Sequence, residues 1–260
     1  MNSRYNHQEN FDVPDGKCLG GQMRNSLLLV LPLLLILGCG NPWDDQYEEW
    51  MKTPARYGGV EVLQKIKNVQ KYGRSGISDT GDKNITDLTP FAELRNLSAL
   101  GLQQNKISDL SPLSELKNLR SLALYDNRIA DLTPLAGLSK LDLLALMNNI
   151  IADLTPLAGL TDLTHLHLHK NIISDLTPLA GLKNLSVLTL SYNNISDLTP
   201  LAGLTSLTEL DLGKNNFTDL SPLTGLKNLN KLHLLWTDIS LAQRDMLKKA
   251  LPNTEIIWDY

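Results

Sequence analysis

Hydrophobic and polar positions along most of the chain repeat with a period of 22 residues. Each unit carries a Leu-x-Leu pair, an asparagine, an isoleucine or phenylalanine, and then Asp-Leu-Thr/Ser-Pro-Leu. The asparagines are Asn105, Asn127, Asn149, Asn171, Asn193 and Asn215, the aspartates are Asp87, Asp109, Asp131, Asp153, Asp175, Asp197 and Asp219, and the prolines are Pro90, Pro112, Pro134, Pro156, Pro178, Pro200 and Pro222. A fixed period of this length predicts a solenoid, in which each unit buries its apolar face against the next.

The residues of one unit predict its local structure. A Leu-x-Leu pair such as Leu122 and Leu124 has the period of a strand with one face buried. The asparagine turns the chain inward, and its amide can donate to and accept from backbone groups, so stacked turns form an asparagine ladder. Proline suits the first position of a helical turn, and the preceding Thr or Ser can cap it. We therefore expect a short 3-10 turn near each proline, on the convex side.

The regular column of aspartates has two interpretations. Like charges one turn apart repel, so a ladder of bound calcium ions is conceivable. Each aspartate, however, stands beside a leucine in a turn that leads to Thr/Ser-Pro. That position favours a structural role, in which the carboxylate accepts hydrogen bonds from backbone N–H groups of its own or the neighbouring turn.

The pattern LxxLxLxxNxIxDLxPLxxL resembles the leucine-rich repeats of bacterial internalins, over residues 77–239. The resemblance implies an α/β solenoid, a right-handed superhelix with a parallel sheet on its concave face. It also implies a binding role, commonly for proteins, and no enzymatic activity or cofactor.

Both ends of the array depart from the pattern, as capping units do. Helical spacing of Val62, Leu63, Ile66 and Val69 predicts an N-terminal helical cap over residues 54–76. At the first turn, the register places Ser78 and Thr80 in the two leucine positions and Lys83 in the asparagine position. The C-terminal cap, residues 240–260, is expected to hold a helix from Leu241 to about Leu251, with Leu241, Met246, Leu247 and Ala250 as its apolar residues, and a strand over 255–258.

The N-terminal region predicts an export signal. The apolar run 27–37 is too short for a bilayer and follows Met23-Arg24, so residues 23–38 resemble a secretory signal peptide. The run ends in Leu37-Gly38-Cys39, which resembles a bacterial lipobox, although Leu37 departs from the usual small residue. We expect Cys39 to carry a lipid; the alternative is an ordinary signal peptide with an incidental cysteine.

The predicted signal peptide divides the N-terminal region into further segments. Residues 1–22 are expected to be an extension upstream of the true start, and residues 39–53 a lipidated acidic tether. The expected location is the bacterial cell envelope, with the protein exported and held by its lipid. The outer membrane is preferred, because Gly40 replaces the aspartate associated with inner-membrane retention.

Composition narrows the choice of partner. The chain has 56 leucines, a fifth of its 260 residues, which the repeated pattern explains. Its net charge of −4 argues against nucleic acid, which requires a basic face. Two cysteines cannot make a disulfide framework. No glycine-rich phosphate loop or nucleophile motif is present, so the sequence predicts no catalytic site.

The residues between and after the paired leucines should face solvent on the concave side. Three histidines fall on one such strand, next to a strand with exposed Leu143 and Met147. Exposed apolar residues beside polar groups often mark interaction sites. The predicted ligand-binding residues are Tyr125, Leu143, Met147, His165, His167, His169, Thr189 and Tyr192.

Several alternatives remain for this surface. The histidines could hold a metal ion, but the nearest carboxylates, Glu209 and Asp211, are two strands away. They could also make a contact that changes with pH near 6.5. The leading hypothesis is a lipid-anchored module that binds a protein or peptide on its concave face. The others are a structural spacer of the envelope without a ligand and, less favoured, a metal-dependent function.

Overall fold

The computed structural model describes residues 52–57, 59, 61–66, 76–77, 80 and 83–258. They belong to one compact unit spanning Asn41–Tyr260. The predicted extension, the signal peptide and Cys39 lie outside the described residues, as does most of the predicted tether. Within the described part, no helix is both long and apolar enough to cross a membrane.

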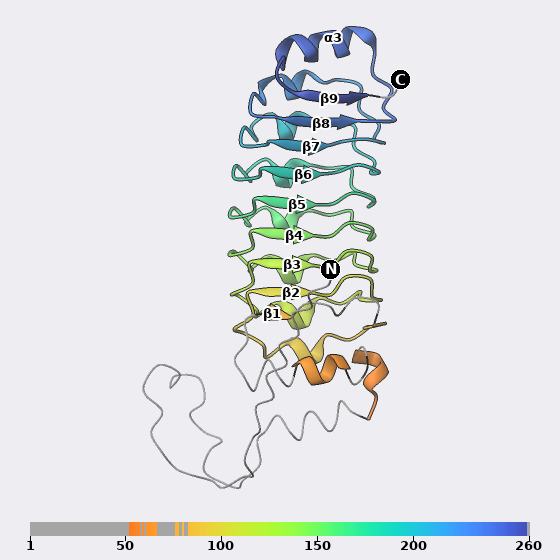
Figure 1. The fold of residues 1–260 in the computed structure, drawn as a ribbon, viewed down its shortest axis with the longest axis vertical. Coiled ribbons are helices and arrows are strands. Elements are labelled where there is room, and N and C mark those ends of the chain that lie inside the picture. The colour runs from red at the N-terminus through yellow and green to blue at the C-terminus, as the bar shows by residue number, and fades with distance from the viewer. Residues whose placement is uncertain are drawn as a thin grey trace, which may run out of the picture. The chain divides into compact units, whose positions relative to one another are not determined.

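Nine parallel strands form one sheet in which each strand pairs with its neighbours in the sequence, as Figure 1 shows. From β2 to β8 the paired residues are 22 positions apart, as at Leu144 and Leu166. The predicted parallel sheet and its repeat register are therefore confirmed. The strands are β1 Gly76–Ile77, β2 Ala99–Gly101, β3 Ser121–Ala123, β4 Leu143–Ala145, β5 His165–His167, β6 Val187–Thr189, β7 Glu209–Asp211, β8 Lys231–Leu234 and β9 Glu255–Trp258.

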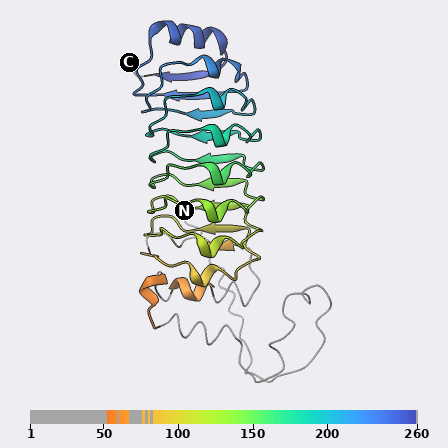
Figure 2. The ribbon, with the colours of Figure 1, turned by 180° about the vertical axis from the view of Figure 1, so that it is seen from behind.

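Short 3-10 helices lie behind the sheet, as Figure 2 shows, and confirm the predicted turns at the prolines. They are η2 Thr89–Phe91, η3 Ser111–Leu113, η4 Thr133–Leu135, η5 Thr155–Leu157, η6 Thr177–Leu179, η7 Thr199–Leu201 and η8 Ser221–Gly225. Another 3-10 helix, η1 Pro54–Tyr57, belongs to the N-terminal cap region.

The predicted capping of these turns by Thr or Ser is wrong. In η5 the threonine is already the first helical residue, and Leu154 at the N-cap makes no side-chain hydrogen bond. The Asp153 carboxylate takes over this role, because its Oδ1 accepts a 2.8 Å hydrogen bond from the Thr155 N–H. The same bond recurs from Asp87 to Asp219. The structural interpretation of the aspartates is thus confirmed.

The asparagine ladder is present as predicted. Asn171 is buried; its Oδ1 accepts from the Ile151 N–H at 3.0 Å, and its Nδ2 donates to the carbonyls of Leu146 at 3.1 Å and Leu168 at 3.0 Å. Each asparagine therefore joins its own turn to the one before. The leucines and isoleucines around the ladder form one continuous core, each buried leucine contributing roughly 1.5–3 kcal/mol.

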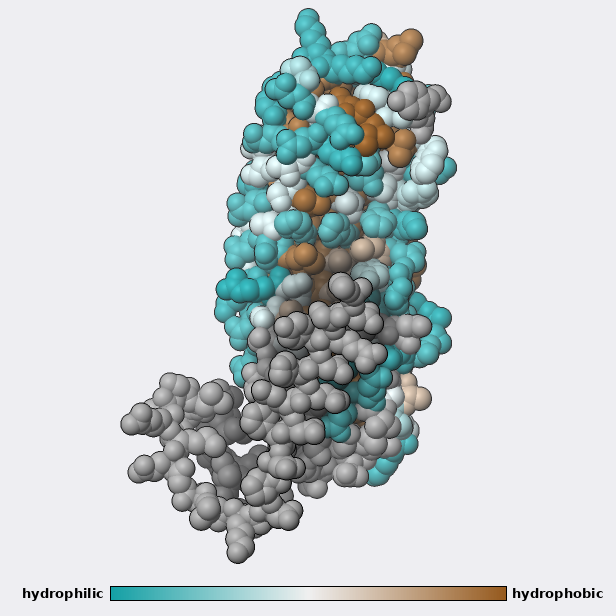
Figure 3. Space-filling view, viewed as in Figure 1, coloured by the Kyte–Doolittle hydropathy of each residue, from teal (hydrophilic) through white to brown (hydrophobic). Residues whose placement is uncertain are grey.

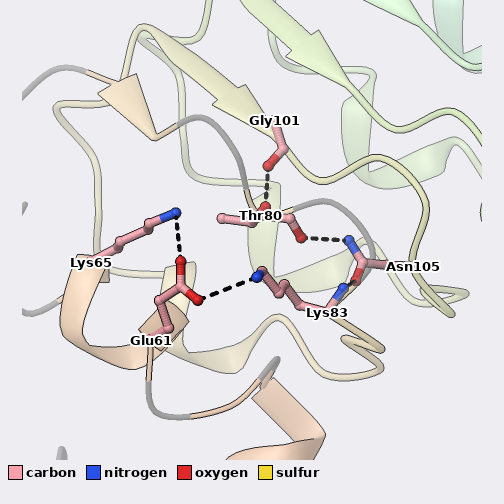
Figure 4. A network of polar contacts seen from close by, with 6 residues as sticks. All are labelled: Glu61, Lys65, Thr80, Lys83, Gly101 and Asn105. Atoms are coloured by element: carbon pink, nitrogen blue, oxygen red, sulfur yellow. Dashed lines mark hydrogen bonds and ion pairs between the residues drawn. The ribbon is translucent and has the colours of Figure 1, made fainter.

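The N-terminal end of the core is covered by a helical segment, residues 61–66. Its residues Val62, Leu63 and Ile66 are fully buried in the core. Glu61 connects this segment to the first turn: its carboxylate lies 3.4 Å from Lys65 Nζ and 3.2 Å from Lys83 Nζ, as Figure 4 shows.

The first turn is one residue longer than the sequence register predicts. Ile77 pairs with Leu100, so Ile77 occupies the first leucine position that we assigned to Ser78. Thr80 does occupy the second position, because its carbonyl accepts from Asn105 Nδ2 as a leucine carbonyl does in later turns. Its hydroxyl donates to the Gly101 carbonyl, which satisfies a polar group inside the core (Figure 4).

The C-terminal end is closed by helix α3, Leu241–Ala250, and by β9, which extends the sheet. The Ser240 side chain caps α3 by accepting from the Gln243 N–H. Leu247 is buried, and Met246 and Ala250 pack against the core. The expected role of Leu241 is wrong: its side chain is 77% exposed at the first position of the helix.

Candidate binding surface

The concave floor consists of the outward-facing residues of the sheet. Its part towards the C-terminal strands, which the grey atoms leave visible in Figure 3, is a mixture of apolar and polar side chains. The register places His165 between Leu143 and Val187, and it places His167 beside Thr189. These five side chains are half-buried by their neighbours. The central part of the predicted site therefore forms one continuous strip across β4, β5 and β6.

Three other predicted residues continue this strip. Met147 and His169 follow the ends of β4 and β5, where the Asn148 N–H still donates to the His169 carbonyl at 3.0 Å. Tyr125 precedes them one turn earlier, with its carbonyl accepting from the Gln104 N–H at 2.8 Å.

The histidines interact with hydroxyl groups. His167 Nδ1 and His169 Nδ1 lie 3.3 Å and 3.1 Å from the same Thr189 Oγ1, and His165 Nδ1 lies 2.7 Å from Thr164 Oγ1. Across the described residues, no group of three or more His, Cys, Asp or Glu side chains is placed to hold a metal ion. The histidines thus contribute hydrogen-bonding groups fixed by threonines.

Burial keeps two of these imidazoles neutral. Partial burial lowers the pKa of His167, and the neighbouring His169 and His165 lower it further, against the opposing influence of Glu209. Burial also lowers the pKa of His169, although Asp211 acts in the opposite direction. At neutral pH the strip therefore presents these two rings uncharged beside aliphatic side chains.

Tyr192 takes a different position from the other seven predicted residues. It lies in a left-handed turn at φ 57°, and its ring meets Trp236 edge-to-face with centroids 5.7 Å apart. Trp236 stands two turns further along the chain. Tyr192 thus contacts a residue that is not among the predicted ligand-binding residues.

Tyr192 belongs to a set that we call the left-handed column. Its members directly precede the asparagine position in successive turns and have φ between 54° and 57°: Gln104, Asp126, Asn148, Lys170, Tyr192, Lys214 and Trp236. Non-glycine residues rarely adopt this conformation. The column was missed because its residues share no chemical type; only their place before the ladder position connects them.

The family described as Leucine Rich repeats (2 copies) matches residues 117–159, 139–181, 161–203 and 183–225. Internalin C2 from Listeria monocytogenes has a similar structure, with TM-score 0.69 and 34% sequence identity over 81% of this chain and 91% of that one. The chain belongs to the leucine-rich repeat family.

Two further leucine-rich repeat structures are similar over smaller shares of their length. One, from Leptospira interrogans, has TM-score 0.62 and 35% identity over 66% of this chain and 45% of that one. The other is the ectodomain of a plant receptor kinase from Arabidopsis thaliana in complex with Casparian strip integrity factor 2, with TM-score 0.54 and 25% identity over 59% and 20% of the two chains. No curated protein sequence matches significantly.

This leucine-rich repeat protein has a second recessed surface, the edge cavity, beside the left-handed column. Its volume is about 640 Å³. The side chains that give it its chemistry are Tyr192, Lys214 and Trp236 of the column, and Asn194, Asn216 and Asp238 two positions after them. The Tyr192 and Trp236 residues are 40% and 57% exposed, so both aromatic groups are accessible to a ligand.

Proposed function

We propose that the protein is an exported, lipid-anchored module that captures a protein ligand on its concave floor. The observation that carries the proposal is the half-buried strip of Leu143, Met147, His165 and His167 along β4 and β5. Leucine-rich repeat proteins commonly bind proteins, and the similar plant receptor is described in complex with Casparian strip integrity factor 2.

The chemistry of the strip suits a protein surface. Interfaces between proteins place apolar and aromatic groups at the centre and charged groups at the rim. Here the central strands offer Leu143, Val187 and Met147, whereas β7 and β8 add Glu209 and Lys231, which pair in register. The parallel strands lie about 4.8 Å apart, so seven of them span roughly 30 Å.

A pair of charge insertions tests the concave floor. Met147→Glu combined with His167→Glu places carboxylates in the strip, and we expect it to abolish capture of the partner from envelope extracts. Ser139→Glu is the matched control, because this exposed residue lies on a connection outside the floor. Both variants should keep the wild-type melting temperature. If the double variant captures the same proteins as wild type, the binding hypothesis fails and a structural spacer is favoured.

The lipid anchor is a separate part of the proposal and rests on the run 27–37 and the Gly38-Cys39 junction. We expect wild-type protein to incorporate radiolabelled palmitate in bacteria, to lose about the mass of the predicted signal peptide, residues 23–38, and to fractionate with outer membranes. Cys39→Ser should remain unlabelled, whereas Cys18→Ser, which lies before the predicted signal peptide, should behave as wild type. Equal labelling of the Cys39→Ser protein would contradict the anchor.

A further inference from the structure

We propose that the edge cavity is a binding site for a neutral oligosaccharide, separate from protein capture on the concave floor. Among the described residues, the large hydrophobic side chains that are exposed are Ile150, Ile172, Tyr192, Trp236 and Leu241. Three of these five, Ile172, Tyr192 and Trp236, line this one cavity. Such a gathering of exposed apolar surface around a recess indicates a ligand.

The aromatic pair favours a ring with apolar C–H faces. Tyr192 and Trp236 meet edge-to-face at an angle of 68°, so the two rings are not stacked and both remain partly exposed. The face of an aromatic ring carries partial negative charge and attracts C–H groups, which a sugar ring presents on one side. Two rings at an angle can thus hold one sugar unit or two adjoining units.

The polar lining favours hydroxyl groups. The side chains of Asn194, Asn216 and Asp238 make no hydrogen bond or ion pair with any other residue that the structure describes. Each amide offers an acceptor and two donors, and the carboxylate offers acceptors, which suits a ligand that both donates and accepts. Vicinal hydroxyls do both.

The charges exclude strongly ionic ligands. Lys214 and Asp238 are the charged residues of the lining, one of each sign. An organic cation would be attracted to two aromatic rings, but Lys214 stands in the column between them and repels it. The balance favours a neutral ligand.

The backbone hydrogen bonds at this edge exclude a peptide that binds as an added strand. A peptide that adds a strand needs unpaired backbone groups along an edge. At this edge the N–H groups are already used: Tyr192 donates to Gly213 at 2.9 Å, Lys214 to Leu235 at 2.8 Å, and Asn216 to Ile195 at 2.8 Å. The same bonds hold the lining in place before a ligand arrives, which lowers the entropic cost of binding.

Calorimetric titration of the full-length protein, in a detergent without a sugar headgroup, tests the site. The probes are chitotetraose, cellotetraose, maltotetraose and a galactose tetramer, with a tetralysine peptide as the cationic alternative. We expect at least one tetrasaccharide to bind, and Trp236→Ala to weaken it at least about tenfold. Ile150→Ala, an exposed apolar residue outside the cavity, should bind as wild type.

Two further variants keep the test independent of folding and of the concave floor. Asn194→Leu with Asn216→Leu leaves the aromatic pair in place and should still lose tetrasaccharide binding. Met147→Glu with His167→Glu should leave that binding unchanged even where it abolishes protein capture. Absence of binding to every tetrasaccharide, equal binding by Trp236→Ala, or binding of tetralysine alone would overturn the proposal.

Discussion

Two neighbouring columns of side chains run along the same edge of the solenoid and have opposite roles. The ladder asparagine points inward and is the same residue in six successive turns, whereas the residue directly before it differs in almost every turn. Backbone hydrogen bonds between turns hold the left-handed column, whereas side-chain hydrogen bonds hold the ladder asparagines. One position of the repeat therefore carries stability, and its immediate neighbour is free to carry recognition.

The difference follows from where the polar groups lie. Inside the coil, the Asn171 amide satisfies one N–H and two carbonyl groups, which requires a side chain that both accepts and donates. Outside, the left-handed turn points its side chain into solvent, and any residue that tolerates positive φ is accepted. Variation at that position changes the surface while the fold remains the same.

The largest expected effect comes from breaking the ladder. Asn171→Ala leaves one N–H and two carbonyls without partners in the core, each costing about 1–3 kcal/mol. We expect roughly 3 kcal/mol or more of lost unfolding free energy, measured by urea denaturation. Lys170→Ala, one residue earlier, should change it by less than about 0.5 kcal/mol. Equal losses in the two variants would contradict the contrast between the columns.

A smaller effect should appear when backbone conformation is tested in the left-handed column itself. Lys170→Val places a β-branched residue at φ 57° and should destabilise the protein by about 1 kcal/mol. Lys170→Gly relieves the steric strain and adds unfolded-state entropy of similar size, so its stability should stay near wild type. Urea denaturation compares the two, and a more stable valine variant would refute a left-handed turn here.

The sequence predicted the parts of this fold that repeat. The strands, the ladder and the 3-10 turns follow from positions such as Leu144, Asn171 and Pro156, because a pattern that returns every 22 residues leaves one way to stack. The ends were predicted less well: Ile77 replaced Ser78 in the core, and Leu241 is exposed, since a single turn has no copy to confirm its register.

The candidate sites divide in the same way. The concave strip could be predicted because strand alternation fixes which residues face outward, as at Leu143 and His165. The edge cavity could not, because it depends on contacts between turns that are not adjacent. Tyr192 and Trp236 are 44 positions apart in the chain, and no periodicity indicates that their rings meet.

A third prediction concerns the aspartates as part of the scaffold. Hydrogen bonds from the Thr155 side chain and backbone lower the pKa of Asp153, and the same cause acts at Asp131, Asp175 and Asp197. A carboxylate whose pKa is lower in the folded state than in the unfolded state stabilises the fold at pH values above its unfolded pKa of about 3.9. This stabilisation is lost as the pH falls through the pKa of the folded state.

The measurement is the melting temperature between pH 5 and pH 2. Wild type should lose stability steadily below pH 4, and Asp153→Asn should lose less over that range while starting slightly lower at pH 5. Asp162→Asn, which changes an exposed aspartate outside the column, serves as the control. If the melting temperatures of Asp153→Asn and wild type fall equally with pH, the Asp153 carboxylate does not stabilise the scaffold as predicted.

The smallest effect is expected from the histidines of the concave strip, which lie half-buried on the outer face of the sheet and not in the core. Burial lowers the pKa values of His167 and His169, so the unfolded chain takes up protons first as pH falls below about 6.5. Stability is therefore highest above pH 6.5 and declines down to the lowered folded pKa values, after which this contribution is fully lost. His167→Gln with His169→Gln should flatten the melting temperature between pH 7.5 and pH 5, whereas Ser139→Gln, which changes an exposed residue without a titrating group, should keep the wild-type slope. Because both rings are half exposed, the flattening should be slight.

A steeper slope in the double variant would mean that the strip holds its histidines in the charged form, and the neutral binding surface proposed for it would be wrong.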